Sequence, residues 1–219
     1  RARLDPLAEA ALQGIDLNLG LAPDTLDGSA RQVLAPNAAL DAAAEAHSAW
    51  MLQTDIFSHT GVNNSDPGQR MTTAGYQFTG SWTWGENIAW SGTTGTVNLA
   101  SAISGHHHGL FLSSGHRLNI LNDAFREVGM AQVGGQFTYN GTIYNSSMAT
   151  QAFATSGSRE IGKRALVYFK LLYKIEEDID GRSPKEKLKV RQEKSKVIIL
   201  ELKDWIDSKR SKIPPKSVG

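Results

Sequence analysis

The chain has 219 residues, no cysteine and a formal net charge of +1. Its length suits one domain of ordinary size with a smaller addition. The lack of cysteine excludes disulfide frameworks, thiolate metal sites and cysteine nucleophiles. No stretch approaches the roughly 18 to 20 consecutive apolar residues of a membrane helix, and the first residues have the pattern of an amphipathic helix rather than of a signal peptide.

The small net charge conceals two parts of opposite sign. Residues 1–158 hold six Arg, no Lys and twelve Asp and Glu, a balance of −6, whereas residues 159–219 hold seventeen Lys and Arg against ten acids, a balance of +7. All the histidines lie in the first part. We therefore predict two segments of different origin that meet after Ser158.

Two helices are predicted in the first half of the chain. The first covers 38–53, with Asn37 as its N-cap, and the second begins after Asp66, with Pro67 at its first position and Gly75 at its end. The residues predicted to form the buried stripe of the first helix are Leu40, Ala44, His47 and Met51. We expect His47 to be a core histidine whose hydrogen bonds are satisfied.

A further helix is predicted over "GTVNLASAISGHHHGLFL". The residues that recur at helical spacing there are Val97, Ala100, Ile103, His107, Leu110 and Phe111. Each helical step turns by about 100°, so His107 falls on this stripe while His106 and His108 point to either side of it. We expect His107 alone of the three to face inward; the other interpretation is that it packs and makes one hydrogen bond.

The last part of the first segment, from Arg126 onward, changes to short alternating runs separated by Gly-Gly and by Asn-Gly. Such runs predict strands joined by hairpin turns. Helices followed by an antiparallel sheet indicate an α+β domain.

Five motifs in order carry a resemblance to a known family. They are "HSAWMLQTDIFSHTG", "RMTTAGY", "WGENIAW", "LFLSSGHRLNIL" and "FREVGMA". Together they resemble the CAP superfamily of cysteine-rich secretory proteins, antigen five and pathogenesis-related proteins, in its bacterial SCP-like form, over about residues 1–157. The resemblance implies a three-layer α-β-α sandwich with an open central cavity.

In that cavity the family often presents two histidines and two glutamates. The resemblance assigns His59, Glu86 and His116 to three of these positions, and the second glutamate has no counterpart, so His107 is the candidate to replace it. His59 and His116 would bind zinc or another divalent cation weakly. The alternative is that these residues hydrogen-bond to one another and to water in a polar cleft.

Two functions follow from this cavity. The first is a secreted bacterial binding module that holds a small apolar or lipid-like ligand, with or without a divalent ion. The second is a metal-assisted hydrolase of peptides or esters that uses the same residues to activate water. The sequence has no "GxSxG" motif and places no serine beside a base, so we assign no catalytic residue.

Residues 159–219 are predicted to form a basic helical hairpin. Ser183, Pro184 and Glu186 have the pattern of a helix start. The motifs "LYKIE", "RQEKS" and "IPPKS" resemble a part of the insertion-sequence family sixty-six transposases that lies outside their catalytic acids. Basic helices can bind nucleic acid through phosphates, so nucleic-acid binding by this hairpin is a third candidate function. The many acids here are more typical of a solvated surface, so we do not expect nucleic acid as a partner.

Overall fold

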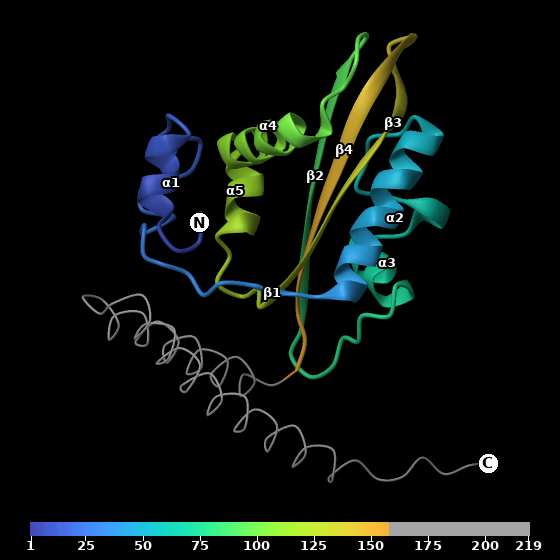
Figure 1. Ribbon diagram of the computed structural model, residues 1–219. Coiled ribbons are helices and arrows are strands. Elements are labelled where there is room, and N and C mark those ends of the chain that lie inside the picture. The colour runs from blue at the N-terminus through green and yellow to red at the C-terminus, as the bar shows by residue number, and fades with distance from the viewer. Residues whose placement is uncertain (158–219) are drawn as a thin grey trace, which may run out of the picture. The chain divides into compact units, whose positions relative to one another are not determined.

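The computed structural model describes residues 1–157 of the chain (Figure 1). The chain divides into two compact units, Arg1–Ser158 and Arg159–Gly219, and the predicted helical hairpin lies outside the described residues. The elements of the first unit are α1 (Pro6–Leu12), β1 (Ala35–Pro36), α2 (Ala38–Thr54), the 3-10 turn η1 (Val62–Asn64), α3 (Pro67–Thr73), β2 (Thr83–Thr93), α4 (Leu99–Leu112), α5 (Ser114–Ile120), β3 (Glu127–Tyr139) and β4 (Thr142–Thr155).

One sheet with the strand order β1-β3-β4-β2 forms the centre of this unit. Strands β3 and β4 form an antiparallel hairpin, β2 pairs antiparallel with β4, and the short β1 pairs parallel with β3. The hairpin turns at Asn140 and Gly141, which both have positive φ angles, 49° and 77°. Asn-Gly is favoured in such turns because both residues tolerate this conformation. The turn predicted at Asn-Gly is confirmed.

The turn predicted at Gly-Gly is wrong, because Gly134 and Gly135 lie inside β3. Successive residues of a strand face opposite sides of the sheet. A Cβ atom on Gly134 would lie 3.0 Å from the side chain of Leu99, and one on Gly135 would lie 3.1 Å from that of Leu52. These glycines therefore leave room for side chains of α4 and α2 and do not turn the chain.

Helices lie against both faces of the sheet, with α2 and α3 on one side and α4 and α5 on the other, and α1 lies beyond α4 and α5 (Figure 1). One core cluster contains Leu110, Phe111 and Phe153 together with Ala10 from α1. A second cluster joins Leu40 of α2 to residues of α3 and β4. The described unit is therefore a mixed α/β fold. Within residues 1–157, the model has no helix with the length and apolar character that crossing a membrane requires.

The two helices predicted first are confirmed by their caps and by their burial. The Asn37 side chain accepts hydrogen bonds from the first turn of α2, at 3.0 and 3.3 Å, and all four residues of the predicted stripe are buried. Helix α3 begins with a capping box in which Asp66 and Gln69 each accept a hydrogen bond from the other's backbone N–H. These local hydrogen bonds fix where both helices start.

Helix α4 is present, but its buried face differs from the predicted stripe. His106 is buried and its Nε2 lies 2.8 Å from Oγ of Ser147 on β4, whereas Ile103 is 57 % exposed. His107 instead faces α1, where its Nε2 lies 2.8 Å from Oε1 of Glu9. The expectation that His107 alone faces inward is therefore wrong, whereas the other interpretation, that His107 packs and makes one hydrogen bond, agrees with its contact to Glu9. Helix α4 has two covered sides, and the sequence could not show that α1 would cover the second.

Candidate functional site

Glu86 is the centre of a buried polar cluster on the edge strand β2. Its side chain is 4 % exposed, and both of its carboxylate oxygens accept hydrogen bonds. Oε1 accepts from Nδ1 of His59 at 2.9 Å, and Oε2 accepts from Arg70 at 2.7 Å. The carboxylate thereby holds the proton of His59 on Nδ1. The side chain of His59 is about half exposed, and its Nε2 can act as a base or as a ligand.

Arg70 holds the loop after α2 against α3. One of its terminal nitrogens donates to the backbone carbonyls of His59, at 3.0 Å, and Ser65, at 2.7 Å, while the other binds Glu86. Arg70 is 8 % exposed, so its charge and that of Glu86 compensate each other away from water. Such a pair is costly to break on one side, because the remaining charge stays buried.

His47, on α2, joins the same cluster. The ring is 1 % exposed, and its Nε2 donates to the backbone carbonyl of Ser58 at 2.9 Å and lies 3.8 Å from Oε1 of Glu86. Burial lowers its pKa, so the ring is neutral near pH 7. Its Nδ1 has no hydrogen-bond partner. His47 is thus buried as predicted, but only half of its hydrogen bonding is satisfied.

The structure brings His116 to the same region from α5. Its backbone carbonyl accepts a hydrogen bond from Asn87, the neighbour of Glu86, at 3.1 Å. Burial lowers the pKa of the His116 ring, and the nearby His59 lowers it further. Of the four side chains predicted for the cavity, His59 contacts Glu86 directly, and His116 is linked to them through the effect of His59 on its pKa and through the contact of its backbone with Asn87.

His107, the fourth predicted residue, lies in a different cluster. It contacts Glu9, which is also hydrogen-bonded by Arg1 and Gln13. The hydrogen bond from Arg1 is the main reason that the pKa of Glu9 falls to about 2. His107 therefore helps to attach α1 to α4, and it does not replace the missing acid beside Glu86.

The residues around Glu86 fit a hydrogen-bonded cluster better than a metal centre. Within residues 1–157, no three His, Cys, Asp or Glu side chains are grouped so that they could hold a metal ion. Both oxygens of Glu86 are already engaged, one of them by the cationic Arg70. Zinc binding by His59 and His116 stays a prediction.

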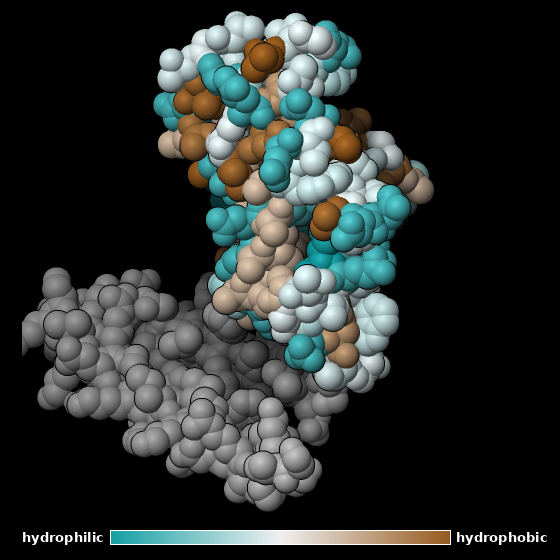
Figure 2. Space-filling view, turned by 90° about the vertical axis from the view of Figure 1, so that its right-hand side faces the viewer, coloured by the Kyte–Doolittle hydropathy of each residue, from teal (hydrophilic) through white to brown (hydrophobic). Residues whose placement is uncertain are grey.

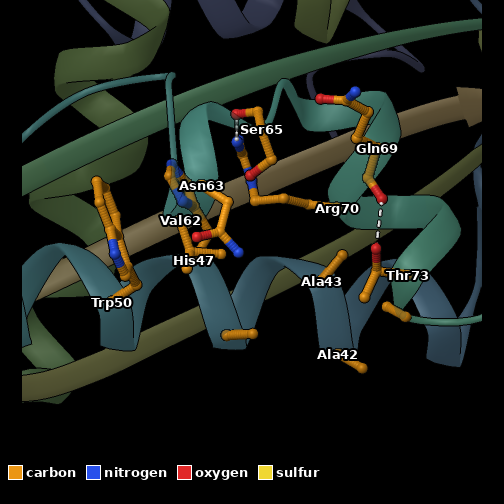
Figure 3. A pocket seen from close by; sticks show the side chains of 12 residues that line it. Ala42, Ala43, His47, Trp50, Val62, Asn63, Ser65, Gln69, Arg70 and Thr73 are labelled. Atoms are coloured by element: carbon orange, nitrogen blue, oxygen red, sulfur yellow. Dashed lines mark hydrogen bonds between the residues drawn. The ribbon is translucent and has the colours of Figure 1, made fainter.

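A groove of about 600 Å³ lies next to this cluster, between α2, α3 and η1 (Figure 3). Figure 2 views this side of the molecule, on which a weakly apolar strip borders hydrophilic side chains. The groove is lined by Ala42, Ala43, Ala46, His47, Trp50, Val62, Asn63, Ser65, Gln69, Arg70, Thr73 and Ala74. The four residues predicted for the cavity are not among them, but His47 and Arg70 belong both to the groove and to the cluster around Glu86.

Sequence reasoning did not find His47 and Arg70 as site residues. Both lie inside motifs that carry the family resemblance, "HSAWMLQTDIFSHTG" and "RMTTAGY". Their position in these motifs is the signal in the sequence that could have identified them as site residues. His47 falls on the buried stripe of α2, and that position indicates a core residue. A residue on such a stripe can face both the core and a groove where the next helix leaves a gap.

Two family models match different parts of the chain. The family model described as cysteine-rich secretory protein family (CAP) matches residues 29–153, and the model described as transposase IS66 family matches residues 149–219. A crystal structure of an extracellular protein containing a SCP domain from Bacillus anthracis str. Ames is 26 % identical, with a TM-score of 0.40. That match covers 56 % of this chain and 34 % of the other, so it spans about a third of that protein's length. Among curated proteins no match is found.

Proposed function

Since this chain belongs to the cysteine-rich secretory protein (CAP) family, we propose that it is a secreted bacterial binding module whose α2–α3 groove holds a small apolar or lipid-like ligand. The single observation that carries this proposal is the groove itself. Its volume of about 600 Å³ lies within the range of sites for small molecules. Secretion is supported by the description of the family.

The side chains of the groove suit an apolar chain. Helix α2 contributes Ala42, Ala43 and Ala46, whose small side chains leave space between α2 and α3. Trp50 and Val62 add larger apolar surface, and Val62 is 51 % exposed. An apolar ligand would remove this surface from water, which is the main favourable contribution to binding in such a site.

Two alanines of α2 provide a matched test of the groove. Ala46 lines the groove, whereas Ala49 is exposed on the same helix and does not line it. We expect Ala46→Trp to weaken binding of the neutral dye N-phenyl-1-naphthylamine about tenfold or more, because overpacking the site costs at least about 1.4 kcal/mol. Ala49→Trp should bind the dye as the unchanged protein does. Dye fluorescence measures both affinities, and equal affinities in the two variants would reject the groove as the site.

Metal binding is a separate part of the proposal. If His59 and His116 hold zinc, calorimetric titration should detect binding to the unchanged protein and none to the double variant His59→Ala with His116→Ala. The expected affinity is weak, since two histidines do not complete the four-ligand shell that zinc prefers. Equal binding in both proteins would remove the metal from the proposal. The metal-assisted hydrolase stays a prediction that no contact around Glu86 favours over binding.

A further inference from the structure

Met130 differs from the other methionines of the chain in its exposure to solvent. All four methionines lie within residues 1–157, and Met51, Met71 and Met148 are at most 1 % exposed. Met130, on β3, is 59 % exposed. The chain has no cysteine. Because a thioether is readily oxidised to a sulfoxide where an oxidant can contact it, an oxidant that attacks sulfur in this protein meets Met130 first.

Met130 is the outer member of a row of three side chains across the sheet. It lies opposite Gln151 of β4, and Gln151 lies opposite Asn87 of β2. Residues opposite each other on neighbouring strands project from the same face of the sheet. Sδ of Met130 lies 3.8 Å from Nε2 of Gln151, and Oε1 of Gln151 accepts a hydrogen bond from Nδ2 of Asn87 at 3.0 Å. Hydrogen bonds therefore connect an exposed sulfur to Asn87, which is completely buried.

Asn87 connects this row to the candidate site. Its Nδ2 also donates to the backbone carbonyl of His116 at 3.1 Å, and its Oδ1 accepts from Asn119 at 2.9 Å. Asn119 donates in addition to the backbone carbonyl of Glu86 at 3.2 Å. The asparagine that binds Gln151 therefore also binds the main chain of His116 and, through Asn119, is linked to that of Glu86.

Oxidation changes what residue 130 offers to Gln151. Sulfur attacks one oxygen of hydrogen peroxide, so that an S–O bond forms while the O–O bond breaks. Sulfur is oxidised by two electrons, and the other oxygen leaves as hydroxide and takes up the remaining proton to form water. A thioether sulfur is a weak hydrogen-bond acceptor, whereas the sulfoxide is polar. The amide of Gln151 then has a stronger acceptor beside its Nε2.

We propose that Met130 is a site of reversible oxidation and that its sulfoxide acts on the main chain of His116 through Gln151 and Asn87. Hydrogen bonds in a chain polarise one another, so a stronger acceptor at Nε2 of Gln151 makes its Oε1 a stronger acceptor for Asn87. Methionine sulfoxide reductases restore the thioether. Neither step requires a ligand in the groove, so the oxidation site does not depend on the proposed function.

Peptide mass spectrometry of the full-length protein in hydrogen peroxide tests the site of oxidation. Samples taken over time give a rate for each methionine. We expect Met130 to gain one oxygen atom at least about tenfold faster than Met51, Met71 or Met148, because buried side chains react only when the domain opens locally. Similar rates at all four methionines would overturn the proposal.

Nuclear magnetic resonance of the isotope-labelled full-length protein tests the connection to the site. On oxidation, we expect the side-chain N–H signals of Gln151 and Asn87 to move by more than their line widths, in the direction of a stronger hydrogen bond. The signal of the Arg117 backbone N–H, in the peptide group of the His116 carbonyl, should move with them. Treatment with both methionine sulfoxide reductases and a thiol should return the signals. A shift at Gln151 with none at Asn87 would disprove the connection.

Two variants provide the controls. Met130→Leu keeps a similar volume but has no sulfur at this position, so peroxide should leave the Asn87 signals unchanged. Gln151→Ala interrupts the row, while Asn87 keeps its hydrogen bonds to His116 and Asn119. In that variant Met130 should still be oxidised, but the Asn87 signals should no longer respond. A response of Asn87 that persists in either variant would mean that oxidation acts by another route, and the proposal would fail.

Discussion

Acid acts on this domain through three histidines with lowered pKa, of which His47 and His106 are buried and His116 is partly buried. Burial is the largest cause of the lowered pKa of His47, His106 and His116, because a charged imidazole loses its hydration inside the fold. In the unfolded chain each ring has a pKa of about 6.5. Below this value the unfolded state therefore binds more protons than the folded state does.

The free energy of unfolding should consequently be constant above about pH 7.5 and should fall as the pH drops through 6.5, by at most about 1.4 kcal/mol per pH unit for each histidine. Urea denaturation at pH 7.5, 6.5 and 5.5 measures this slope. The variant His106→Gln can still hydrogen-bond to Ser147 but cannot take up a proton, so its slope should be shallower. A stability that does not change between pH 7.5 and 5.5 would contradict this account.

At the scale of elements, the contact between α2 and β3 depends on a glycine. A Cβ atom on Gly129 would lie 2.0 Å from the backbone carbon of Leu40 and 2.1 Å from the backbone nitrogen of Asp41. Backbone atoms cannot rotate away as the end of a side chain can. Any side chain at this position would therefore push α2 off the sheet and open the core cluster that contains Leu40.

Gly129→Ala should lower the free energy of unfolding by roughly 3 kcal/mol or more, a loss typical of strong overpacking. The matched control is Gly115→Ala on α5, where a Cβ atom meets no other atom within 4 Å. Alanine favours the helix there, so the control should change stability by no more than about 1 kcal/mol, in the stabilising direction. Urea denaturation followed by circular dichroism compares the two variants, and similar losses in both would refute the packing argument.

For the molecule as a whole, composition and family matches divide the chain at nearly the same place. The balance of charge changes sign after Ser158, the CAP match ends at 153 and the transposase match begins at 149. In contrast, residues before the CAP match belong to the first unit, since Ala2, Ala10, Leu17 and Leu26 are buried in its first core cluster. We propose that residues 1–158 fold as one independent domain.

A chain that ends at Ser158 should then unfold cooperatively. Its thermal midpoint should lie within about 2 °C of the midpoint of the same domain in the full chain, which corresponds to a difference in the free energy of unfolding below about 1 kcal/mol. A chain that lacks residues 1–27 should lose this cooperative transition, because it lacks part of the core. Scanning calorimetry of the three proteins compares their midpoints. Failure of the 1–158 chain to fold, or normal unfolding without residues 1–27, would contradict the proposed boundaries.

The sequence by itself determined the features that depend on neighbouring residues. Asn37 and Asp66 mark the starts of α2 and α3 because their side chains bind N–H groups within three residues of them. The Asn140–Gly141 turn follows in the same way from the φ angles that these two residues tolerate. The resemblance added His59 and Glu86, which the structure joins at 2.9 Å.

Only the tertiary structure decided the features that depend on how elements pack together. Whether His106 or His107 faces the sheet depends on Ser147 and Glu9, which lie 41 and 98 residues away along the chain. The groove exists because α2 and α3 leave a gap beside η1, and no local pattern encodes that gap. Caps and turns act over a few residues, so the sequence determined where the elements begin and end. Burial and the pairing of polar groups depend on contacts between distant segments, so the packing of the elements determined the site.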